Sequence, residues 1–514
     1  MSRTAAVAEL PLPPDGGAAA PPDDLATGWR CGGCGFTVVP GTPVPMRCPA
    51  AVAGDDVDHV LVRTLATRGL DRADGGEPNP FVRFRRRFHA WHATQALGQA
   101  DTESVRLVEQ LDDAIAGVDG HGFATTPLTA SADLDAALEI APGRVLVKDE
   151  TGNVGGSHKA RHLAGTVLEL EANEALARAT TAAAGRHEPD RAPARLAISS
   201  CGNAALAAAV VARAWGRELD VFIPTDADPA VVARLHDLDA RVTVADRDAD
   251  LPGDPAYRLL AAAVADGALP FTCQGNENGF AIEGGMTLGY ELAGQLVATG
   301  TALDHLVVQV GGGALASSCI QALREAVALG ELDRMPRIHT VQTRGAWPLA
   351  RAWDLAAARL LGHEPDGRHR LPPRSNATAD ELALRALTAA GAAILDDLPR
   401  HRSAWMWPWE TAPHSVAHGI LDDETYDWYA VVRGMVETGG QPVVVDEATL
   451  SAANRLAMRA TGIDVDHTGS AGLAGLLDLR RRGEIAADET VAVLFTGVRR
   501  THPAGSTGHP GDRS

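Results

Sequence analysis

Lys159 ends a glycine-rich segment in which a reactive amine can meet a flat ligand. The segment reads Lys148-Asp149-Glu150-Thr151-Gly152-Asn153-Val154-Gly155-Gly156-Ser157-His158-Lys159. A strand-like apolar run, Val145 to Val147, precedes it, and an apolar helical pattern follows it. Lysine amines form Schiff bases with carbonyl cofactors, and small neighbouring residues let a planar ring approach. The sequence therefore predicts that Lys159 binds pyridoxal 5'-phosphate (PLP) as a Schiff base.

A second polar loop, Ser199-Ser200-Cys201-Gly202-Asn203, joins a strand-like run to an alanine-rich helical pattern. Backbone N–H groups at a helix start bind anions. Ser199, Ser200, Cys201 and Gly202 are therefore candidates for binding a substrate carboxylate, and Asn203 is a candidate for bonding a ring hydroxyl of the cofactor. Ser and Asn also cap helices routinely, and a cap explains this loop better if it is taken alone.

Three consecutive glycines, Gly311, Gly312 and Gly313, follow the apolar run His305 to Val310 and precede a helical pattern that begins at Ala314. Glycines let a backbone approach a phosphate at a helix N-terminus, so these four residues are candidates for the cofactor phosphate. The spacing fits neither a dinucleotide fingerprint nor a P-loop. A tight turn without a ligand explains the motif equally well on its own.

Thr496 closes the last strand-like run, Leu494-Phe495-Thr496-Gly497. Its hydroxyl is a candidate partner for the pyridine nitrogen of PLP. A neutral hydroxyl does not hold that nitrogen protonated as a carboxylate does, and the weaker electron sink favours prompt elimination. A plain strand-end threonine is the alternative.

These loops belong to an alternating pattern of strands and helices. The predicted strands are 144–148, 195–199, 220–223, 241–244, 305–310, 337–342 and 490–495, and the predicted helices are 159–172, 203–215, 229–238, 314–328 and 448–461. The alternation predicts an α/β architecture with parallel sheets. Ligands of such sheets bind at the carboxyl ends of strands, where all four motifs lie.

The four motifs in this order resemble fold-type II PLP enzymes, which include threonine synthase, the tryptophan synthase β subunit and serine/threonine dehydratase. The resemblance covers residues 79–345 and 440–500. It implies two open, twisted, mostly parallel sheets with flanking helices and the cofactor in the cleft between two subdomains. It also implies that Lys159 is the Schiff-base lysine and the base at the substrate Cα, with Asn203 at the phenolate oxygen, Gly311 to Gly313 at the phosphate and Thr496 at the ring nitrogen.

The same resemblance implies β- or γ-elimination or replacement on an amino acid, with threonine-synthase-like lyase chemistry first. Serine/threonine dehydratase-like deamination is the alternative. A rival of another class is a non-catalytic PLP-binding protein that acts in regulation or assembly. The run Ser157-His158-Lys159-Ala160-Arg161 matches no single family member, which leaves the substrate open. A homodimer is expected because dimers are usual in the family.

A cysteine cluster near the N-terminus predicts a metal site. Cys31 and Cys34 form a Cys-x2-Cys knuckle, and Cys48 follows after thirteen residues. A second knuckle is broken by Ala51, so His59 is the expected fourth ligand, with Asp55, Asp56 or Asp58 as weaker choices. Some threonine synthases carry a similar zinc ribbon, so we expect structural zinc within residues 28–62. A relic hairpin that has lost its metal is the alternative.

Composition limits the class of protein. Lys+Arg 46 against Asp+Glu 66 gives a net charge of -20, which argues against nucleic-acid and anionic-membrane partners. The sequence has neither a bilayer-length apolar run nor a secretory signal, and six cysteines in 514 residues fit a reducing cytoplasm. We expect disordered tails at 1–27 and 502–514, a catalytic core at 79–500 and a smaller subdomain at about 150–265.

Residues 345–440 exceed what the family core needs and contain six of the nine tryptophans. Such density predicts a covered pocket or interface, or equally an extra apolar core. If the insert lies at the site, His414, Ser415 and His418 are candidates for facing the substrate side chain. The basic run Arg83 to Arg87 is a weaker candidate for a phosphate-bearing substrate, because a solvated basic face explains it better.

Overall fold

The computed structural model describes residues 27–67, 70, 76–183, 193–225, 227–246, 254–363 and 373–500. The tails expected at 1–27 and 502–514 lie outside these ranges, except for Thr27, which begins a strand. Among the described helices, none is both long enough and apolar enough to cross a membrane.

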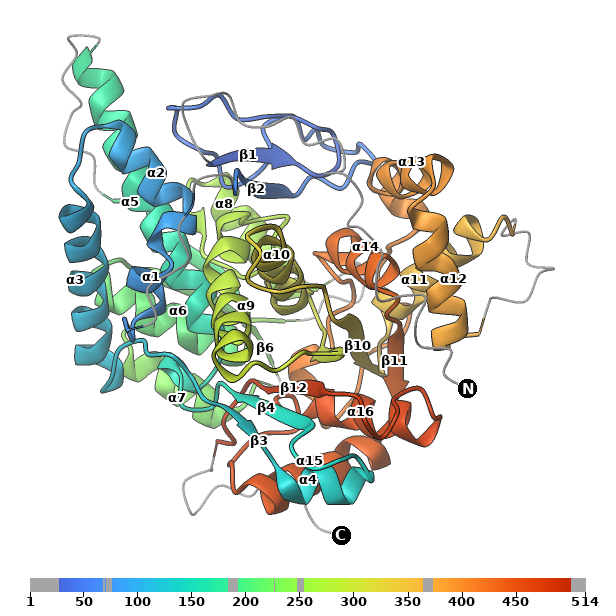
Figure 1. Ribbon diagram of the computed structural model, residues 1–514. Coiled ribbons are helices and arrows are strands. Elements are labelled where there is room, and N and C mark those ends of the chain that lie inside the picture. Colours follow the sequence, from blue (N-terminus) through green and yellow to red (C-terminus); the bar gives the residue numbers. More distant parts are fainter. Residues whose placement is uncertain are drawn as a thin grey trace.

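Six strands form the larger sheet in the order β11-β10-β9-β12-β4-β3 (Figure 1). Their bounds are β3 Leu128–Ala130, β4 Val145–Asp149, β9 His305–Gln309, β10 Arg337–Thr343, β11 Pro442–Val445 and β12 Val491–Phe495. Neighbouring strands are parallel except β3 and β4. The carboxyl ends of β4, β12 and β9 therefore lie side by side at one edge of the sheet.

Apolar helices cover both faces of this sheet. Val491 and Val493 of β12 belong to one buried cluster, whereas Ala492 and Leu494 belong to the other, as the two-residue period of a strand requires. The first face is covered by α4 Ala132–Leu138, α15 Glu447–Thr461 and α16 Ala471–Arg481. The second is covered by α9 Phe280–Thr299, α10 Ala314–Ala328, α11 Pro348–Leu360 and α14 Trp428–Thr438. Burial on both faces explains the continuous apolar runs that predict these strands.

Four parallel strands form the smaller sheet in the order β7-β6-β5-β8. Their bounds are β5 Leu196–Ser199, β6 Leu219–Pro224, β7 Arg241–Ala245 and β8 Leu269–Pro270, and the accompanying helices are α5 Lys159–Ala183, α6 Asn203–Ala214, α7 Pro229–Asp237 and α8 Pro255–Ala265. The two sheets confirm the predicted fold class. Helix α5 extends to Ala183, beyond the predicted end at residue 172, because residues 173–183 contain five alanines, which form helices well.

The N-terminal hairpin packs on the core of the molecule. Strands β1 Thr27–Cys31 and β2 Leu61–Leu65 pair antiparallel. Trp29 meets Phe280 of α9 edge to face at 5.4 Å between ring centroids. The buried Arg63 guanidinium pairs with Glu283 at 2.9 Å and Glu325 at 2.8 Å. Three helices complete this side: α1 Pro80–Arg83, α2 His89–Ala96 and α3 Asp101–Asp119.

The aromatic insert contains α11, α12 Asn376–Ala386, α13 Ala389–Asp397, η3 Leu398–Ala404, η4 His418–Ile420 and α14. Trp353 and Trp428 are fully buried in the cluster on the second face of the larger sheet, so these two belong to an apolar core. Trp407 and Trp409 instead flank the Arg351 guanidinium, which lies 3.7 Å and 5.2 Å from their ring centroids. The insert thus holds both kinds of aromatic packing.

The basic run 83–87 forms part of α1 and of η1 Arg85–Arg87. Arg85 pairs with Asp101 at 2.6 Å, and Arg87 pairs with Glu331. The Arg86 guanidinium lies over the Trp91 ring. These contacts explain the run as structural, without a phosphate-bearing ligand.

Candidate functional site

Lys159 is the first residue of α5, directly after the turn that follows β4. Gly155 and Gly156 have φ of 67° and 69°, a left-handed backbone that favours glycine and lets the chain turn from strand to helix. A bridge between Ser157 and Gly497 pairs this turn with the end of β12. The side chain of Lys159 is half-buried.

The lysine content of the chain singles out Lys159. The chain contains two lysines, Lys148 and Lys159. Lys148 is fully buried, and its Nζ donates to Glu291 Oε2 at 2.6 Å, Thr126 O at 2.8 Å and Gln295 Oε1 at 3.0 Å. An ammonium has three donors, so all those of Lys148 are engaged. Lys159 is therefore the lysine that can condense with an aldehyde.

Thr496 lies beside the Lys159 turn and is 2% exposed. Its backbone carbonyl accepts from the His158 N–H at 3.4 Å. Its hydroxyl oxygen accepts from Gln309 Nε2 at 2.6 Å, and Gln309 ends the neighbouring strand β9. Because the amide uses an acceptor position of the hydroxyl, the hydroxyl proton stays available for another acceptor.

The glycine loop begins two residues after Gln309 and is closely covered by residues 420–427 of the insert. Thr425 Oγ1 donates to Gly311 O at 2.9 Å, and the Asp427 N–H donates to Gly312 O at 2.9 Å. A Cβ on Gly311 would lie 2.2 Å from Asp422 Oδ2, so this position requires glycine. Gly313 has φ of 100°, and α10 begins at the next residue, Ala314.

Two carboxyl groups near the glycine loop have raised pKa values. Burial raises the pKa of Asp422 to about 6, and the nearby Lys159 opposes that shift. Burial raises the pKa of Asp427 to about 8, although the Gly275 N–H donates to Asp427 Oδ2 at 3.4 Å. Neither residue has a signal in the sequence, because the loop 420–427 meets the glycine loop only in the fold.

Asn203 is the first residue of α6, and its side chain does not cap that helix. Its Oδ1 accepts from Arg500 Nη2 at 2.9 Å, and its side chain lies close enough to Asp466 to lower the pKa of that carboxyl, against the larger effect of burial. Arg500 Nη2 donates to Gly155 O at 2.9 Å as well. Asn203, the Lys159 turn and the segment after β12 therefore meet at one point.

Ser199, Ser200, Cys201 and Gly202 form the half-buried connection from β5 to α6. The Ser200 N–H donates to Phe222 O at 3.2 Å, and Ser200 Oγ accepts from the Gly202 N–H at 3.4 Å. The loop lies next to Asn203 at the carboxyl edge of the smaller sheet. Its proposed contact with a substrate carboxylate stays a prediction.

Two neutral histidines lie beside Lys159: His158 precedes it in the chain, and His162 follows one helical turn later on α5. Burial, with the Lys159 charge as the next cause, lowers the pKa of His162 to about 3 and that of His158 well below its usual value. His162 Nδ1 lies 2.7 Å from Ala281 O, and His158 Nδ1 lies 3.3 Å from Thr496 O. Since a carbonyl only accepts, both rings carry their proton on Nδ1. Neither ring adds a positive charge beside the amine.

The side chains around Lys159 match the polar groups of PLP. Lys159 offers an amine for the aldehyde, Asn203 an amide for the phenolate oxygen and Thr496 a hydroxyl proton for the ring nitrogen. The backbone of Gly311 to Gly313 at the start of α10 suits a phosphate. The Asp422 carboxylate departs from this pattern, because its negative charge lies against Gly311, beside the expected phosphate position.

The insert histidines lie at different distances from this arrangement. His414 is exposed, and Ser415 Oγ accepts from the Ala417 N–H at 3.1 Å. His418 is exposed but lies close enough to Asp466 to lower the pKa of that carboxyl, against the larger effect of burial. Of the three insert candidates, His418 therefore lies near the cluster around Asn203, through its effect on Asp466.

The cysteine cluster is assembled as the sequence predicts. Ligand atoms of Cys31, Cys34, Cys48 and His59 all lie within 4.8 Å of one another. Cys34 Sγ is 3.7 Å from Cys48 Sγ, and Cys31 Sγ is 3.6 Å from His59 Nδ1. Edges of about 3.8 Å are expected for thiolates around tetrahedral zinc with Zn–S bonds near 2.3 Å.

The aspartates near His59 have other partners. Asp55 Oδ2 accepts from His59 Nε2 at 3.0 Å, which leaves Nδ1 facing the thiols. Asp56 Oδ1 accepts from the Ser403 N–H at 2.7 Å, and Asp58 pairs with Arg402 at 3.3 Å. The hairpin therefore contacts the insert through residues adjacent to the cysteine cluster. Histidine is the fourth ligand that this geometry favours.

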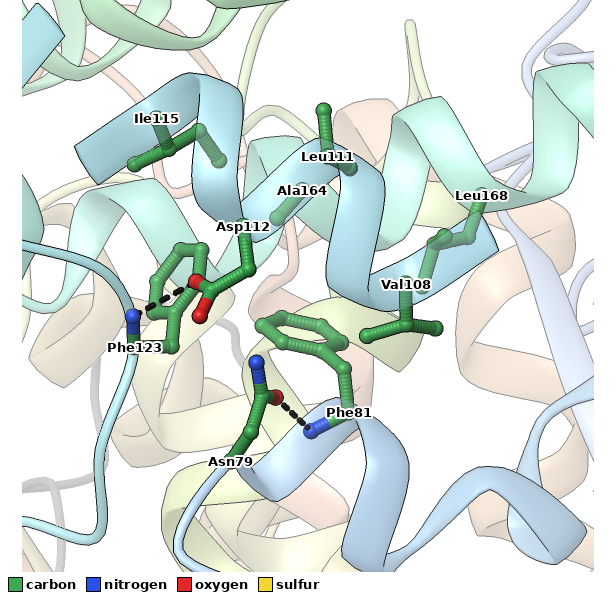
Figure 2. Close-up of a pocket in the computed structure, with 9 residues that line it drawn as sticks. All are labelled: Asn79, Phe81, Val108, Leu111, Asp112, Ile115, Phe123, Ala164 and Leu168. Atoms are coloured by element: carbon green, nitrogen blue, oxygen red, sulfur yellow. Dashed lines mark hydrogen bonds between the residues drawn. The ribbon is translucent and has the colours of Figure 1, made fainter. Parts of the chain in front are cut away.

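A small pocket lies apart from both sites, among α1, α3 and α5 (Figure 2). Asn79 Oδ1 accepts from the Phe81 N–H, and Asp112 Oδ1 accepts from the Phe123 N–H. The other lining residues drawn are apolar, and the space suits about one water molecule. The two polar side chains thus serve backbone groups, and the pocket is too small for an amino-acid substrate.

Comparisons with known proteins agree with this geometry. A profile of the family described as "Pyridoxal-phosphate dependent enzyme" matches residues 121–497. A threonine synthase from Methanosarcina acetivorans is 24% identical over 220 residues, which cover 43% of this chain and 42% of that protein. The match thus spans less than half of that relative.

Solved structures share the fold at low identity. Diaminopropionate ammonia lyase from Escherichia coli has a TM-score of 0.50 and 18% identity, and the match covers 76% of this chain and 88% of that one. A pyridoxal 5'-phosphate-dependent aspartate racemase has a TM-score of 0.50 and 16% identity, with 77% and 96% covered. These likenesses concern the fold.

Proposed function

Because the chain belongs to the family of pyridoxal-phosphate dependent enzymes, we propose that it catalyses β- or γ-elimination or replacement on an amino acid. Threonine-synthase-like chemistry ranks first, since a threonine synthase is among its relatives. Serine/threonine dehydratase-like deamination ranks second. The single observation that carries the proposal is Lys159, an available lysine at the carboxyl edge of the larger sheet.

Each residue has a role in this proposal. Lys159 binds the cofactor and later removes the proton from the substrate Cα through its Nζ atom. Gly311 to Gly313 hold the phosphate, and Asn203 donates to the phenolate oxygen. The loop from Ser199 to Gly202 binds the substrate carboxylate, although the N–H groups of Ser200 and Gly202 already donate to Phe222 O and Ser200 Oγ. When bound, the cofactor supplies an electron sink for the electron pair released at Cα.

Elimination is favoured over other reactions by the neutral partner of the ring nitrogen. Gln309 donates to the Thr496 hydroxyl, so Thr496 is oriented to donate its own proton and carries no charge. A hydroxyl does not keep a pyridine protonated, and a weaker sink favours prompt loss of the leaving group. His158 and His162 stay neutral, so they do not compete with Lys159 as proton donors.

The purified protein provides the test. We expect a visible Schiff-base absorption band, and borohydride reduction should add the cofactor mass to the peptide that contains Lys159. An amino-acid screen for keto-acid or phosphate release then separates dehydratase-like from threonine-synthase-like chemistry. A protein that takes up no added PLP would contradict the proposal. A band that no amino acid changes would instead favour a non-catalytic PLP-binding protein.

We further propose that Cys31, Cys34, Cys48 and His59 hold a structural zinc ion. The supporting observation is that three thiols and one imidazole converge, with Asp55 orienting the imidazole from behind. Zinc there would fix the hairpin without taking part in the reaction. Metal analysis of protein purified without chelator should find about one zinc per chain, and Cys34→Ser should lower that content. Full thiol reactivity in the absence of any metal would favour a relic hairpin.

A homodimer in a reducing cytoplasm remains the proposed setting. All six cysteines lie in described residues and no disulfide joins any two of them, which agrees with a reducing compartment. Sedimentation of the purified protein at several concentrations would test the dimer, and a mass of one chain throughout would contradict it.

A further inference from the structure

The segment after β12 ends, in the described chain, with Arg500 beside the Lys159 turn. Arg500 Nη2 donates to two acceptors at 2.9 Å, the carbonyl of Gly155 and the Oδ1 atom of Asn203. Gly155 itself is held from the other side, because its N–H donates to Asp119 Oδ2 at 2.8 Å. Arg500 thus connects the lysine turn to α6 across the two sheets.

Asp466 completes the arrangement. Burial raises the pKa of Asp466 to about 6, and the nearby Arg500 charge and Asn203 side chain oppose that shift. The Asp466 N–H donates to Gly497 O at 3.0 Å, and Asp466 Oδ1 accepts from the Gly469 N–H. A Cβ on Gly497 would lie 2.8 Å from Asn203 Nδ2 and 3.0 Å from Asp466 Oδ2, so a side chain at position 497 would displace these two groups.

Chemistry fixes the orientation of the Asn203 amide in this cluster. A guanidinium has donors and no acceptor, so only the Oδ1 atom of Asn203 can face Arg500. Above its pKa of about 6 the Asp466 carboxylate has acceptors and no donor, so only the Nδ2 atom can face it. Nδ2 carries two hydrogens, and a bond to Asp466 would use one of them. One N–H therefore stays available, and the wrong amide orientation, which would present a carbonyl, is excluded twice.

We propose that Arg500 and Asp466 act as positioning residues, which hold Asn203 so that its amide offers an N–H to the phenolate oxygen of the cofactor. The inference rests on the proposed PLP binding by Lys159. It assigns to the C-terminal segment a part in the site that neither the four loop motifs nor the matched profile, which ends at residue 497, includes. Arg500 also brings a positive charge close to the expected position of the phenolate oxygen.

Two effects follow when Arg500 is replaced by alanine. The Asn203 amide loses one of the two partners that orient it, so PLP should dissociate about tenfold more readily. Loss of a nearby positive charge makes the protonated Schiff base less unfavourable. The midpoint of the spectral pH titration should therefore move up, by about 0.5–1 pH unit.

The charged groups that act on Arg500 and Asp466 come from several elements. They are Asp119 of α3, Asp228 before α7, Arg234 of α7 and His418 of the insert. Substitution of Arg500 leaves these residues in place. Their contributions are thus shared by the variant and the wild-type protein, and the difference between the two titrations reports on Arg500.

The chain contains a matched control. Arg499, the preceding residue, pairs through Nε with Asp464 Oδ1 at 2.8 Å, and both side chains are about half exposed, 53% and 49%. Arg499→Ala removes the same charge one residue away without touching Asn203. It should leave the titration midpoint and the PLP dissociation constant within about twofold of wild type.

The experiment compares wild type, Arg499→Ala, Arg500→Ala and Arg500→Lys by spectral pH titration and PLP dissociation. Arg500→Lys keeps the charge and should recover part of both effects. If Arg500→Ala does not fold, as judged by circular dichroism, Arg500→Gln decides, because it removes the charge and keeps a long side chain. The inference is overturned if the folded, uncharged Arg500 variant matches Arg499→Ala in both measurements. A wild-type protein without any band would instead contradict the proposed function.

Discussion

The cysteine hairpin and the cofactor cleft are two sites built in opposite ways. The hairpin site is local: Cys31 and His59 are 28 residues apart, and two short strands bring them together. The cleft is global: Asn203 and Arg500 are 297 residues apart, and Gly155 and Arg500 are 345 apart. A local site can be lost or gained with one segment, whereas the cleft depends on both sheets.

The largest expected effect separates chemistry from folding in the cleft. Lys159→Ala should abolish the visible band and lower the reaction rate by at least about 10³-fold, because it removes the amine that binds PLP and takes the proton. The fold should be preserved, since the Lys159 side chain is only half-buried. Absorbance, steady-state kinetics and circular dichroism measure the three quantities. A band that survives would point to an unexpected mode of PLP binding.

The second prediction asks whether the local site fails alone. Cys34→Ser, or chelation, should lower the Tm by about 5 °C, because metal at 100-fold over its Kd stabilises the folded state by about 2.7 kcal/mol. The Schiff-base band should persist, since Trp29 and Arg63 anchor the hairpin to α9 independently of the cysteines. Calorimetry with and without zinc, read beside the absorbance, checks both. Loss of the band together with the metal would show that the two sites are not separable.

The cleft should also differ from the hairpin site in its response to pH, because the cleft contains the buried carboxyl group of Asp427. Burial raises its folded-state pKa to about 8, so the neutral form is favoured in the folded protein. The carboxyl ionises near pH 4 in the unfolded chain. The free energy of unfolding is therefore highest below about pH 4 and falls as the pH rises toward 8. Asp427→Asn should therefore stabilise the protein at pH 8 by up to about 5 kcal/mol and have little effect at pH 4.

Urea unfolding at the two pH values measures this difference. The exposed Asp488→Asn provides a control that should show no such pH dependence. Equal effects of Asp427→Asn at both pH values would mean that the carboxyl stays ionised in the fold.

The smallest expected effect concerns Asp422, whose carboxyl lies against Gly311. Its pKa is raised to about 6 by burial, so above pH 6 it places a negative charge beside the expected phosphate. Asp422→Asn should then bind PLP about fivefold more tightly at pH 8 and almost equally at pH 5. Titration of the apoprotein with PLP measures both constants. Weaker binding by the variant would mean that Asp422 supports the loop instead of opposing the phosphate.

The two regions also differ in how far the sequence predicts them. All seven predicted strands and all five predicted helices form, with ends that shift by one residue or so, except for the longer α5. Strand β11 was not predicted, because its four residues form an apolar run too short to identify as a strand. The convergence of Cys31, Cys34, Cys48 and His59 was predictable, since Cys-x2-Cys spacing itself brings two thiols together.

Four loop motifs of the cleft could be placed on strand ends, because parallel strands bring their carboxyl ends to one edge. The sequence could not place Asp422, Asp466 and Arg500 in the cleft. Each reaches the cleft through a contact with a residue far away in the chain, and none lies in a motif with its own spacing. Gln309 was missed for a related reason, because a buried glutamine at a strand end gives no signal until its partner Thr496 is known.

The position of β12 sets an order for folding. It is the last strand along the chain, yet it lies between β9 and β4 in the larger sheet. That sheet cannot close until nearly the whole chain has left the ribosome, whereas the smaller sheet has all its strands within residues 196–270. In pulse-labelled refolding we expect amides of β5 and β6 to gain protection from exchange before those of β4 and β9. A chain that stops before Val491 would leave two inner strand edges unpaired, a hazard for aggregation.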